Sequence, residues 1–532
     1  MAEWDVVVIG FGAAGACAAI EAADAGARVL VVDRGYGGGA STLSGGVVYA
    51  GGGTRIQRDA GVQDDPDNMF AYLRQEVGGV VSDETLRRFC VDSPSMIEWL
   101  TDQGCEYRGT VCDYKTSYPT DRHYLYYSGN EKAWPYVLEA EPAARGHRQV
   151  APGMSSGKAF FSALRVSAER KGVVFRPLTT VQELITTPEG AISGLRVRTA
   201  DDLGGMHRRT AQAGAKLGNW VPPVGNALTA LAERRWAARA YDEAISADAV
   251  VISAGGFIAN PPMRAEHGAP YADVQPLGTV ADDGSGIALA TALGGATAHM
   301  ERMTAWRFLS PPSAFMEGVT VGPDGARIAN EDLYGATHSE RMVHDYGGRG
   351  FLVLDSTSWK RARRQIAEQT LPFQAAQARY VLTIGHRRAD SLDALARKLG
   401  VSSDGLERTV TAYNDGQRTG AGDPAHKAPD LCRPLEDAPF YGVDISVKNS
   451  PAYPAPGITL GGLVVDEATG GVQRGEGITI EGLYAAGRSA VGLCSTSYVS
   501  GLSLADAVFS GRRAGAHAAA SLGRTERPEV NR

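Results

Sequence analysis

Three glycines and one aspartate near the start of the chain have the types and the spacing that nucleotide binding requires. Gly10, Gly12 and Gly15 form the pattern GxGxxG, and Asp33 follows them further along the chain. In this pattern the first glycine permits a tight turn, the second lets the backbone approach a pyrophosphate, and the third lets a helix pack against a strand. The acid accepts hydrogen bonds from ribose hydroxyls. These residues therefore predict a dinucleotide site.

The segments around these residues must position them. Residues 6–9 and 29–32 are apolar runs that predict strands, and the alanine-rich residues 16–25 predict a helix that ends at Gly26. This order places the amino terminus of the helix, with its unpaired N–H groups and positive dipole end, at the phosphates. The cofactor-binding residues that we expect here are Gly10, Gly12, Ala13, Ala14, Gly15, Asp33 and Arg34.

A second glycine-rich segment favours FAD over NAD. Residues 37–46, GGGASTLSGG, directly follow the predicted ribose-binding strand. In FAD enzymes of the glutathione-reductase-like fold such a loop runs along the pyrophosphate toward the flavin ring; a flexible surface loop is the alternative. The segment contains no histidine, so we expect noncovalent FAD. The contacts expected from it are Ala40, Ser41, Ser44, Gly45 and Gly46.

Segments far along the chain support the same cofactor. Residues 249–257 (AVVISAGGF) and 482–487 (GLYAAG) predict buried strands that end in glycine. Residues 503–515 predict a helix whose amino terminus faces the flavin pyrimidine ring, where negative charge accumulates on reduction. Further cofactor contacts are expected from Ala254, Gly255, Gly256, Asp283, Gly487, Ser503 and Leu504.

The chain must leave this sheet and return to it, because the first strand and the closing helix lie at opposite ends of the sequence. The predicted fold class is α/β, with a Rossmann-type, glutathione-reductase-like FAD-binding domain (residues 1–275 and 442–532) and an inserted α+β catalytic domain (residues 276–441). Within the insertion, residues 392–399 and 406–413 predict helices. The Pro-rich residues 450–456 would lead back to the core. Residues 201–245 predict a peripheral excursion of unknown role.

Composition narrows the function classes. The 532 residues are 43% hydrophobic and 21% charged, as in soluble multidomain proteins. The net charge of −7, without runs of Lys or Arg, argues against nucleic acid and anionic membranes as partners. Six scattered cysteines predict reduced thiols and no metal. Because no signal peptide and no apolar stretch of membrane-spanning length is visible, we expect a cytoplasmic protein.

With these motifs the chain resembles the flavoprotein family of fumarate reductases, succinate dehydrogenases and 3-ketosteroid dehydrogenases. Fumarate reductases bind a dianion through a stretch of the type HxxNRxxGNSL near the carboxy terminus. Residues 494–504 here are CSTSYVSGLSL, with hydroxyls in place of the cationic pair. A site without that arginine cannot pair bidentately with a carboxylate and suits a neutral carbonyl compound. The other motifs that carry the resemblance are residues 282–286 (DDGSG), 327–332 (RIANED), 461–463 (GGL) and 511–515 (GRRAG).

The Tyr-x-Ser-Gly sequence of residues 498–501 resembles the 3-ketosteroid 4-dehydrogenases that act on 5α-steroids. The resemblance implies that Tyr498 donates to the C3 carbonyl oxygen, that Ser500 takes a proton from C4, and that Tyr334 relays this proton or assists the serine. The C5 hydride would pass to flavin N5. Serine is a poor base and tyrosine has an ordinary pKa of about 10, so proton removal is the weakest step. Substrate contacts are expected from Tyr118, Tyr126, Tyr127 and Gly501.

Other functions stay open at this point. The Δ1-dehydrogenases tend to carry YPGPG where residues 498–502 are YVSGL, which lowers that alternative without excluding it. A fumarate-reductase-like reductase of a small unsaturated acid is a second alternative, and a flavoprotein without turnover is a third. The predicted partners are a steroid substrate and an electron acceptor, and the sequence does not identify the acceptor.

Overall fold

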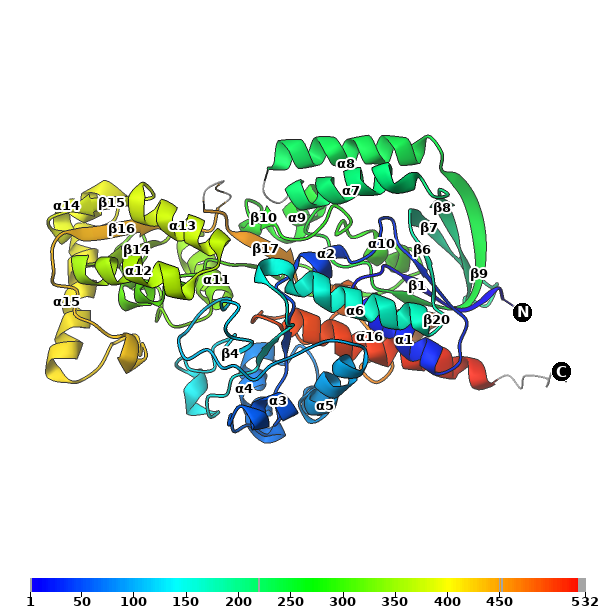
Figure 1. Cartoon of the computed structure of the whole chain (residues 1–532), viewed down its shortest axis with the longest axis horizontal. Helices are drawn as coiled ribbons and strands as arrows, with labels where there is room; N and C mark the ends of the chain where they lie inside the picture. Colours follow the sequence, from blue (N-terminus) through cyan, green and yellow to red (C-terminus); the bar gives the residue numbers. More distant parts are fainter. Residues whose placement is uncertain (1, 219–220, 449, 451–452, 525–532) are drawn as a thin grey trace.

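A mainly parallel sheet carries the first predicted motif, as the computed structural model of the chain shows (Figure 1). The structure describes residues 2–218, 221–448, 450 and 453–524. The strand order β19-β20-β9-β1-β2-β6 brings the two ends of the chain into one sheet, and β7 and β8 extend it through the first half of β9. The strands are β1 (Trp4–Ile9), β2 (Val29–Val32), β6 (Val174–Arg176), β7 (Thr179–Thr186), β8 (Ile192–Thr199), β9 (Tyr241–Ile252), β19 (Gly471–Gln473) and β20 (Thr479–Ala485).

The central strands are buried on both faces, which explains their unbroken apolar sequences. Val6 and Val8 of β1 belong to one core with the helices α1 (Ala13–Asp24), α6 (Ser156–Arg170) and α16 (Leu502–Ala520). Val7 and Ile9 belong to a second core, with β7, β8 and α10 (Ser285–Thr291). The predicted first strand, helix and second strand are confirmed, with the helix starting at Ala13 rather than at residue 16.

The first and last helices of the described chain lie along each other, backbone to backbone (Figure 1). A Cβ atom on Gly511 would lie 2.4 Å from the carbonyl oxygen of Ala14, and one on Gly515 would lie 2.1 Å from that of Ala18. Only glycine permits this approach, because real Cβ contacts do not fall below 3.0 Å. The GRRAG motif thus allows α16 to lie directly against α1.

A second body contains an antiparallel sheet of order β13-β14-β16-β15, drawn at the left of Figure 1. The helix predicted over residues 392–399 is confirmed, and that over 406–413 is part of a longer helix. The division of the chain at residues 276 and 441 stays a prediction. The elements are β13 (Val319–Val321), β14 (Phe351–Leu354), β15 (His386–Ala389), β16 (Phe440–Asp444), α11 (Gly335–Tyr346), α12 (Ser356–Gln369), α13 (Pro372–Thr383), α14 (Leu392–Leu399) and α15 (Ser403–Thr419).

The RIANED motif builds a buried charge network in this body. Glu331 pairs with Arg327 and, at 3.0 Å, with Lys427, and Arg327 also pairs with Asp423 at 3.1 Å. These two cations hold the pKa of Glu331 at about 2 despite its burial. The network fixes the turn that leads into Tyr334 and α11.

The remaining α-helices and β-strands complete the described part of the chain. They are α2 (Gly39–Leu43), β3 (Val47–Tyr49), α3 (Arg55–Asp59), α4 (Pro66–Val77), α5 (Asp83–Asp102), β4 (Leu125–Tyr126), β5 (Gly146–Arg148), α7 (Gly204–Gly218), α8 (Pro222–Ala237), α9 (Pro261–His267), β10 (Gln275–Pro276), β11 (Thr297–Ala298), β12 (Met303–Ala305), β17 (Pro456–Thr459) and β18 (Gly462–Leu463).

One expectation is corrected here. The segment of residues 37–46 is not all loop, because it contains the short helix α2. Residues 201–245, predicted as a peripheral excursion, form the helix pair α7 and α8 and the start of β9. Residues 451 and 452 of the predicted Pro-rich return, and residues 219 and 220, lie outside the described residues.

We predict that Gly515→Ala lowers the melting temperature, because the new methyl group forces α16 away from α1 at a cost of about 1–3 kcal/mol. Gly205→Ala is the matched control, since no atom lies within 4 Å of the position its Cβ would take. Its melting temperature should stay at or slightly above that of the wild type. Differential scanning fluorimetry compares the two, and equal melting temperatures would contradict the packing argument.

Candidate active site

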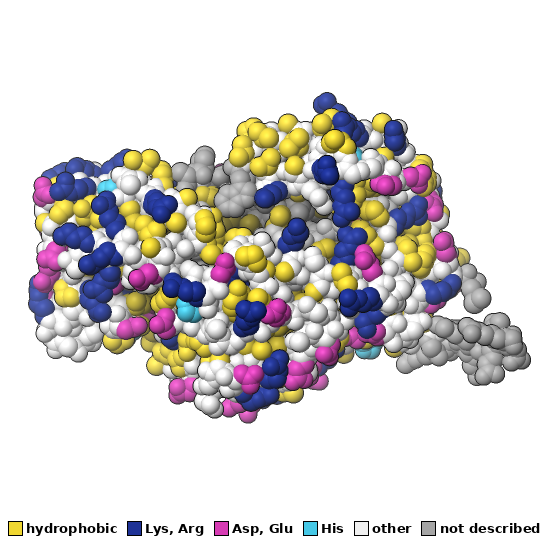
Figure 2. All heavy atoms as spheres, viewed as in Figure 1, with side chains coloured by type: hydrophobic (Ala, Val, Ile, Leu, Met, Phe, Trp, Pro, Cys, Tyr) yellow, Lys and Arg dark blue, Asp and Glu magenta, His cyan; other side chains and the backbone are white. Residues whose placement is uncertain are grey.

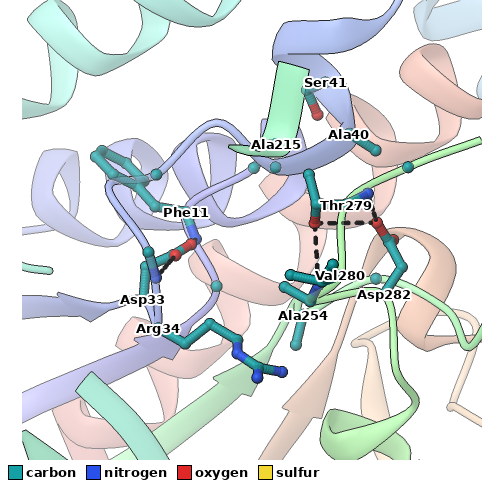
Figure 3. A pocket seen from close by; sticks show the side chains of 18 of the residues that line it. Phe11, Asp33, Arg34, Ala40, Ser41, Ala215, Ala254, Thr279, Val280 and Asp282 are labelled. Atoms are coloured by element: carbon teal, nitrogen blue, oxygen red, sulfur yellow. Dashed lines mark hydrogen bonds between the residues drawn. The ribbon is translucent and has the colours of Figure 1, made fainter. Parts of the chain in front are cut away.

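A cavity of about 670 Å³ opens at the carboxyl ends of β1, β2 and β9. It extends from Asp33 at one end to Ser503 and Leu504, in the first turn of α16, at the other. Figure 3 shows residues of its walls, which come from segments far apart in the sequence. In open α/β sheets ligands bind in such a crevice outside the carboxyl ends of the strands.

The glycine turn forms a cradle on the cavity wall. Gly10 has φ +98°, and a Cβ there would lie 2.7 Å from the carbonyl oxygen of Ser253. Gly12 faces free space, because its Cβ would meet only the Ser41 hydroxyl, at 3.5 Å. That hydroxyl accepts a hydrogen bond from the Ala13 N–H at 3.0 Å, in the first turn of α1. The amino terminus of α1 is therefore open to a phosphate.

Asp33 lies at the end of β2, where the sequence placed the ribose acceptor. Its two oxygens accept hydrogen bonds from the N–H groups of Phe11 (2.8 Å) and Gly35 (2.7 Å). Burial raises the pKa of Asp33, and these N–H groups oppose the rise. A carboxylate can accept about four hydrogen bonds in all, so Asp33 can still bind ribose hydroxyls.

Most of the predicted cofactor residues line this one cavity. Those that do are Gly10, Gly12, Ala13, Ala14, Asp33, Arg34, Ala40, Ser41, Ser44, Ala254, Gly255, Gly487, Ser503 and Leu504.

Five predicted cofactor residues do not line the cavity, and each has another role. Gly15 and Gly256 serve packing, because a Cβ would lie 2.0 Å from the Gly10 oxygen and 2.2 Å from the Thr459 hydroxyl, respectively. Gly45 packs on the ring of Tyr118, and Gly46 on the backbone of residues 156–157. Asp283 forms an ion pair with Arg34 at 2.5 Å.

A loop that the sequence motifs did not predict forms the opposite wall of the cavity. Thr279, Val280, Ala281 and Asp282 line the cavity, and Figure 3 shows three of them facing Ala40 and Ser41 across it. Asp282 accepts from the Thr279 N–H at 2.8 Å and pairs with Arg488 at 2.5 Å. The DDGSG motif was the available signal, but it was assigned to Asp283 rather than to Asp282.

The three predicted catalytic residues lie together beside the α16 end of the cavity. The ring of Tyr498, which lines the cavity, is 6.4 Å from that of Tyr334 and 5.0 Å from that of Trp306. The hydroxyl oxygens of Ser500 and Tyr126 are 3.1 Å apart. The Ser500 hydroxyl also lies next to that of Tyr334.

Burial raises the pKa of Tyr498, Tyr334 and Tyr126, so all three remain protonated near neutral pH. For Tyr498 the backbone N–H of Gly501 opposes this rise, which places that N–H beside the phenol oxygen. A protonated phenol is a hydrogen-bond donor. The three phenols can therefore each donate a hydrogen bond.

Ser500 is held rigidly by its backbone. Its N–H donates to the carbonyl oxygen of Ser128 at 3.3 Å, and the Ser128 hydroxyl donates to the carbonyl oxygen of Ser500 at 3.0 Å. Gly501 then takes φ +94° as the residue before α16, and a Cβ there would lie 2.8 Å from the Tyr49 nitrogen. The Ser500 hydroxyl is thus fixed between two phenols.

The aromatic residues predicted to contact substrate separate into two groups. Tyr118 and Tyr126 pack in one buried cluster with Leu371, next to Ser500. Tyr127 instead stacks against Lys132, whose Nζ lies 3.8 Å from its ring centre. Consecutive side chains in extended backbone point to opposite sides, so Tyr126 faces Ser500 and Tyr127 does not.

A buried carboxyl group connects the segments behind the catalytic residues. Glu76, on α4 and 2% exposed, accepts hydrogen bonds from Tyr72 (2.6 Å), Asn130 (2.7 Å) and Ser497 (3.1 Å). Ser497 precedes Tyr498, and the side-chain oxygen of Asn130 accepts from the Tyr334 N–H at 2.5 Å. Burial raises the pKa of Glu76 to about 7. The sequence offered no signal for this residue.

We predict that Glu76→Gln changes the pH dependence of stability. The folded-state pKa of about 7 lies above the ordinary 4.5, so the stability that the neutral carboxyl contributes is present below pH 4.5 and is lost as the pH rises through 7. Glutamine stays neutral and removes a loss on the order of 3 kcal/mol. Between pH 5 and pH 8.5 the melting temperature should fall less for the variant than for the wild type. Parallel curves would refute the assignment.

Among the described residues no group of three or more His, Cys, Asp or Glu side chains could hold a metal ion. The described helices also include none with the length and apolar character of a membrane span.

Two relatives of known activity match almost the full chain. A 3-oxo-5-alpha-steroid 4-dehydrogenase of Comamonas testosteroni is 38% identical over 500 residues, which cover 91% of this chain and 92% of the relative. A 3-oxosteroid 1-dehydrogenase of Mycolicibacterium smegmatis is 26% identical, with 91% of each chain covered.

The fold is similar to that of a solved 3-ketosteroid-delta4-(5alpha)-dehydrogenase from Rhodococcus jostii in complex with 4-androstene-3,17-dione. The TM-score is 0.81 at 29% identity, over 97% of this chain and 96% of that one. A family model described as FAD binding domain matches residues 5–504. The cradle at Gly12, the acceptor at Asp33 and the helix end at Ser503 fit FAD, so the predicted cofactor and the family resemblance are confirmed. The chain belongs to the FAD binding domain family of flavoproteins.

Proposed function

We propose that this chain is an FAD-dependent 3-ketosteroid 4-dehydrogenase, which introduces a double bond between C4 and C5 of a saturated 3-ketosteroid. One observation carries the proposal: Tyr334, Tyr498 and Ser500, from distant parts of the sequence, meet at the end of the FAD cavity as uncharged hydroxyl groups. The similarity to the Comamonas and Rhodococcus enzymes supports the same reaction.

Tyr498 is the proposed electrophile. Its protonated hydroxyl donates to the C3 carbonyl oxygen of the substrate and stabilises the negative charge that develops there when a proton leaves C4. The Gly501 N–H beside the phenol oxygen strengthens the phenol as a donor, because it withdraws electron density from that oxygen. A buried donor of fixed position acts more strongly than one in water.

Ser500 is the proposed acceptor of the C4 proton. Its hydroxyl lies between those of Tyr126, at 3.1 Å, and Tyr334. When the serine oxygen takes the C4 proton, its own proton passes to one of the two phenol oxygens, and that phenol releases its proton to solvent. The chain of hydroxyls thus gives the proton a route from the serine to solvent. FAD, when bound, supplies the acceptor of the C5 hydride.

The proposed substrate wall is the buried cluster of Tyr118, Tyr126 and Leu371, with Phe373 packed against it. Such aromatic and aliphatic surfaces suit the flat, apolar body of a steroid. Tyr127 is left out of this wall because it packs on Lys132.

A dicarboxylate substrate is not supported by the arginines near the site. Arg307 donates all its described hydrogen bonds to backbone carbonyls, among them those of Ile445 and Ser446, and Arg488 pairs with Asp282. The Δ1 alternative remains less favoured, because residues 498–502 lack the YPGPG pattern. A cytoplasmic location stays a prediction, and experiment must identify the electron acceptor.

The substrate class is tested with purified holoprotein. Incubation with 5α-androstane-3,17-dione and an artificial electron acceptor should reduce the flavin and yield a 4-ene-3-ketone, identified by mass spectrometry and NMR. Fumarate with a reduced viologen dye should give no turnover. A 1-ene product would favour the Δ1 alternative, and failure of every saturated 3-ketosteroid to bleach the flavin would sink the proposal.

We predict that Tyr498→Phe lowers the rate of flavin reduction by about 10²–10³, the usual effect of losing one oxyanion donor. Tyr346→Phe, at the far end of α11, is the matched control and should keep the wild-type rate. Stopped-flow absorbance of the flavin measures both. A Tyr498→Phe rate within twofold of the wild type would remove this residue from the mechanism.

A further inference from the structure

The helix pair α7 and α8 closes one side of the cofactor cavity. Both helices contribute to the lining, and Figure 3 shows Ala215 of α7 beside Ala40 and Ser41 of the pyrophosphate segment. Figure 1 shows α7 between α8 and the body of the FAD domain. The lining residues are His207, Ala211, Gln212 and Ala215 of α7 and Thr229, Ala232, Glu233, Trp236 and Ala237 of α8.

The base of the pair is tied to the segments around Asp33. The hydroxyl of Tyr36, three residues after Asp33, is 2.7 Å from His207 Nδ1. Trp236 Nε1 donates to the carbonyl oxygen of Leu178 at 2.8 Å. Tyr36 and Leu178 themselves line the cavity. The pair therefore lies over the Asp33 end of the cavity, where the adenosine of FAD would bind. Tyr498 lies toward the other end of the cavity.

The two helices form one stiff unit. A Cβ on Gly214 would lie 2.6 Å from the Thr229 hydroxyl, and one on Gly225 would lie 2.2 Å from the Gly218 nitrogen. The buried His207 ring also bridges the helices, because its Nε2 is 3.0 Å from the carbonyl oxygen of Ala232. A rigid pair anchored at its base keeps its inner surface at a fixed place over the cavity.

Core packing does not explain why this pair is present. Most described residues of α8 are exposed, among them Val224 (48%) and Leu231 (40%), and hydrophobic side chains gather on the surface over this helix (Figure 2). The sheet does not depend on the helix pair, because β8 and β9 pair directly with each other. Their antiparallel ladder extends to Thr199 and Tyr241, at the base of the helix pair. The helix pair instead covers the cavity.

We propose that α7 and α8 form a cover for the adenosine half of FAD and retain the noncovalent cofactor. The ligand class is the adenine and ribose of a dinucleotide, enclosed between the α7 and α8 lining and the segment of Asp33 and Tyr36. Enclosure removes apolar surface of the adenine ring from water, which favours binding and slows dissociation. This inference rests on FAD binding and is independent of the steroid reaction.

The ladder at the base of the pair permits a clean deletion. Residues 201–239 are replaced by an Asn-Gly turn, which joins β8 to β9 as a hairpin. We expect the Kd for FAD, measured by quenching of FAD fluorescence on titration with apoprotein, to rise by about tenfold or more, and the dissociation rate to rise with it. Circular dichroism and the melting temperature report whether the shortened protein folds.

A point variant tests the inference without deletion. Ala215→Trp places an indole in the space assigned to the covered cofactor and should raise the Kd for FAD by about tenfold. Ala227→Trp, on the exposed side of α8, is the matched control and should bind FAD as the wild type does. An unchanged Kd in Ala215→Trp, or in a folded deletion protein, would overturn the proposal. Loss of steroid turnover at saturating FAD with an unchanged Kd would instead concern the proposed reaction.

Discussion

The close contact between α1 and α16 is the constraint from which the site follows. Gly511 and Gly515 allow the last helix to lie against the backbone of the first, and this places the amino terminus of α16 beside the glycine turn of residues 10–15. Because Tyr498 and Ser500 directly precede α16, they are carried to the same cavity. One close-packed helix pair thus joins a nucleotide cradle and a set of reactive hydroxyls that stand at opposite ends of the chain.

Tyr334, the third proposed catalytic residue, lies in the second body and is positioned by other interactions. Tyr334 follows the buried network around Glu331, and its N–H donates to Asn130. Asn130 in turn donates to Glu76, which also accepts from Ser497 beside Tyr498. A single buried carboxyl group therefore fixes the relative positions of two phenols that belong to separate parts of the fold. Such positioning matters because the proposed donors must match one carbonyl oxygen.

Local patterns in the sequence were sufficient for the cofactor fold and insufficient for the site around it. The strand, turn and helix up to Asp33 depend on neighbours in sequence, so they could be predicted. The helix α2 was missed because glycine and serine have low helix propensity and the helix is five residues long. Glu76 could not be found, since its partners Asn130 and Ser497 are 54 and 421 residues away.

Local sequence patterns also could not predict the direction of side chains or the cover that α7 and α8 form. Tyr126 and Tyr127 are identical in type, and only the fold shows that the first faces Ser500 while the second packs on Lys132. The sequence of α8 has only a weak apolar stripe, and the inner face of the pair includes small residues such as Ala211 and Ala215 that line a cavity. A pattern method that searches for a core-facing stripe overlooks helices that face a ligand.

The central claim is that uncharged hydroxyl groups at the end of the FAD cavity bind a steroid ketone through its C3 oxygen. A crystal structure of the holoprotein with 4-androstene-3,17-dione tests this claim most directly. The account predicts the C3 oxygen within hydrogen-bonding distance of the Tyr498 hydroxyl, with C4 next to Ser500. A steroid bound with its C3 oxygen away from Tyr498, or with C1 and C2 next to the serine, would contradict it.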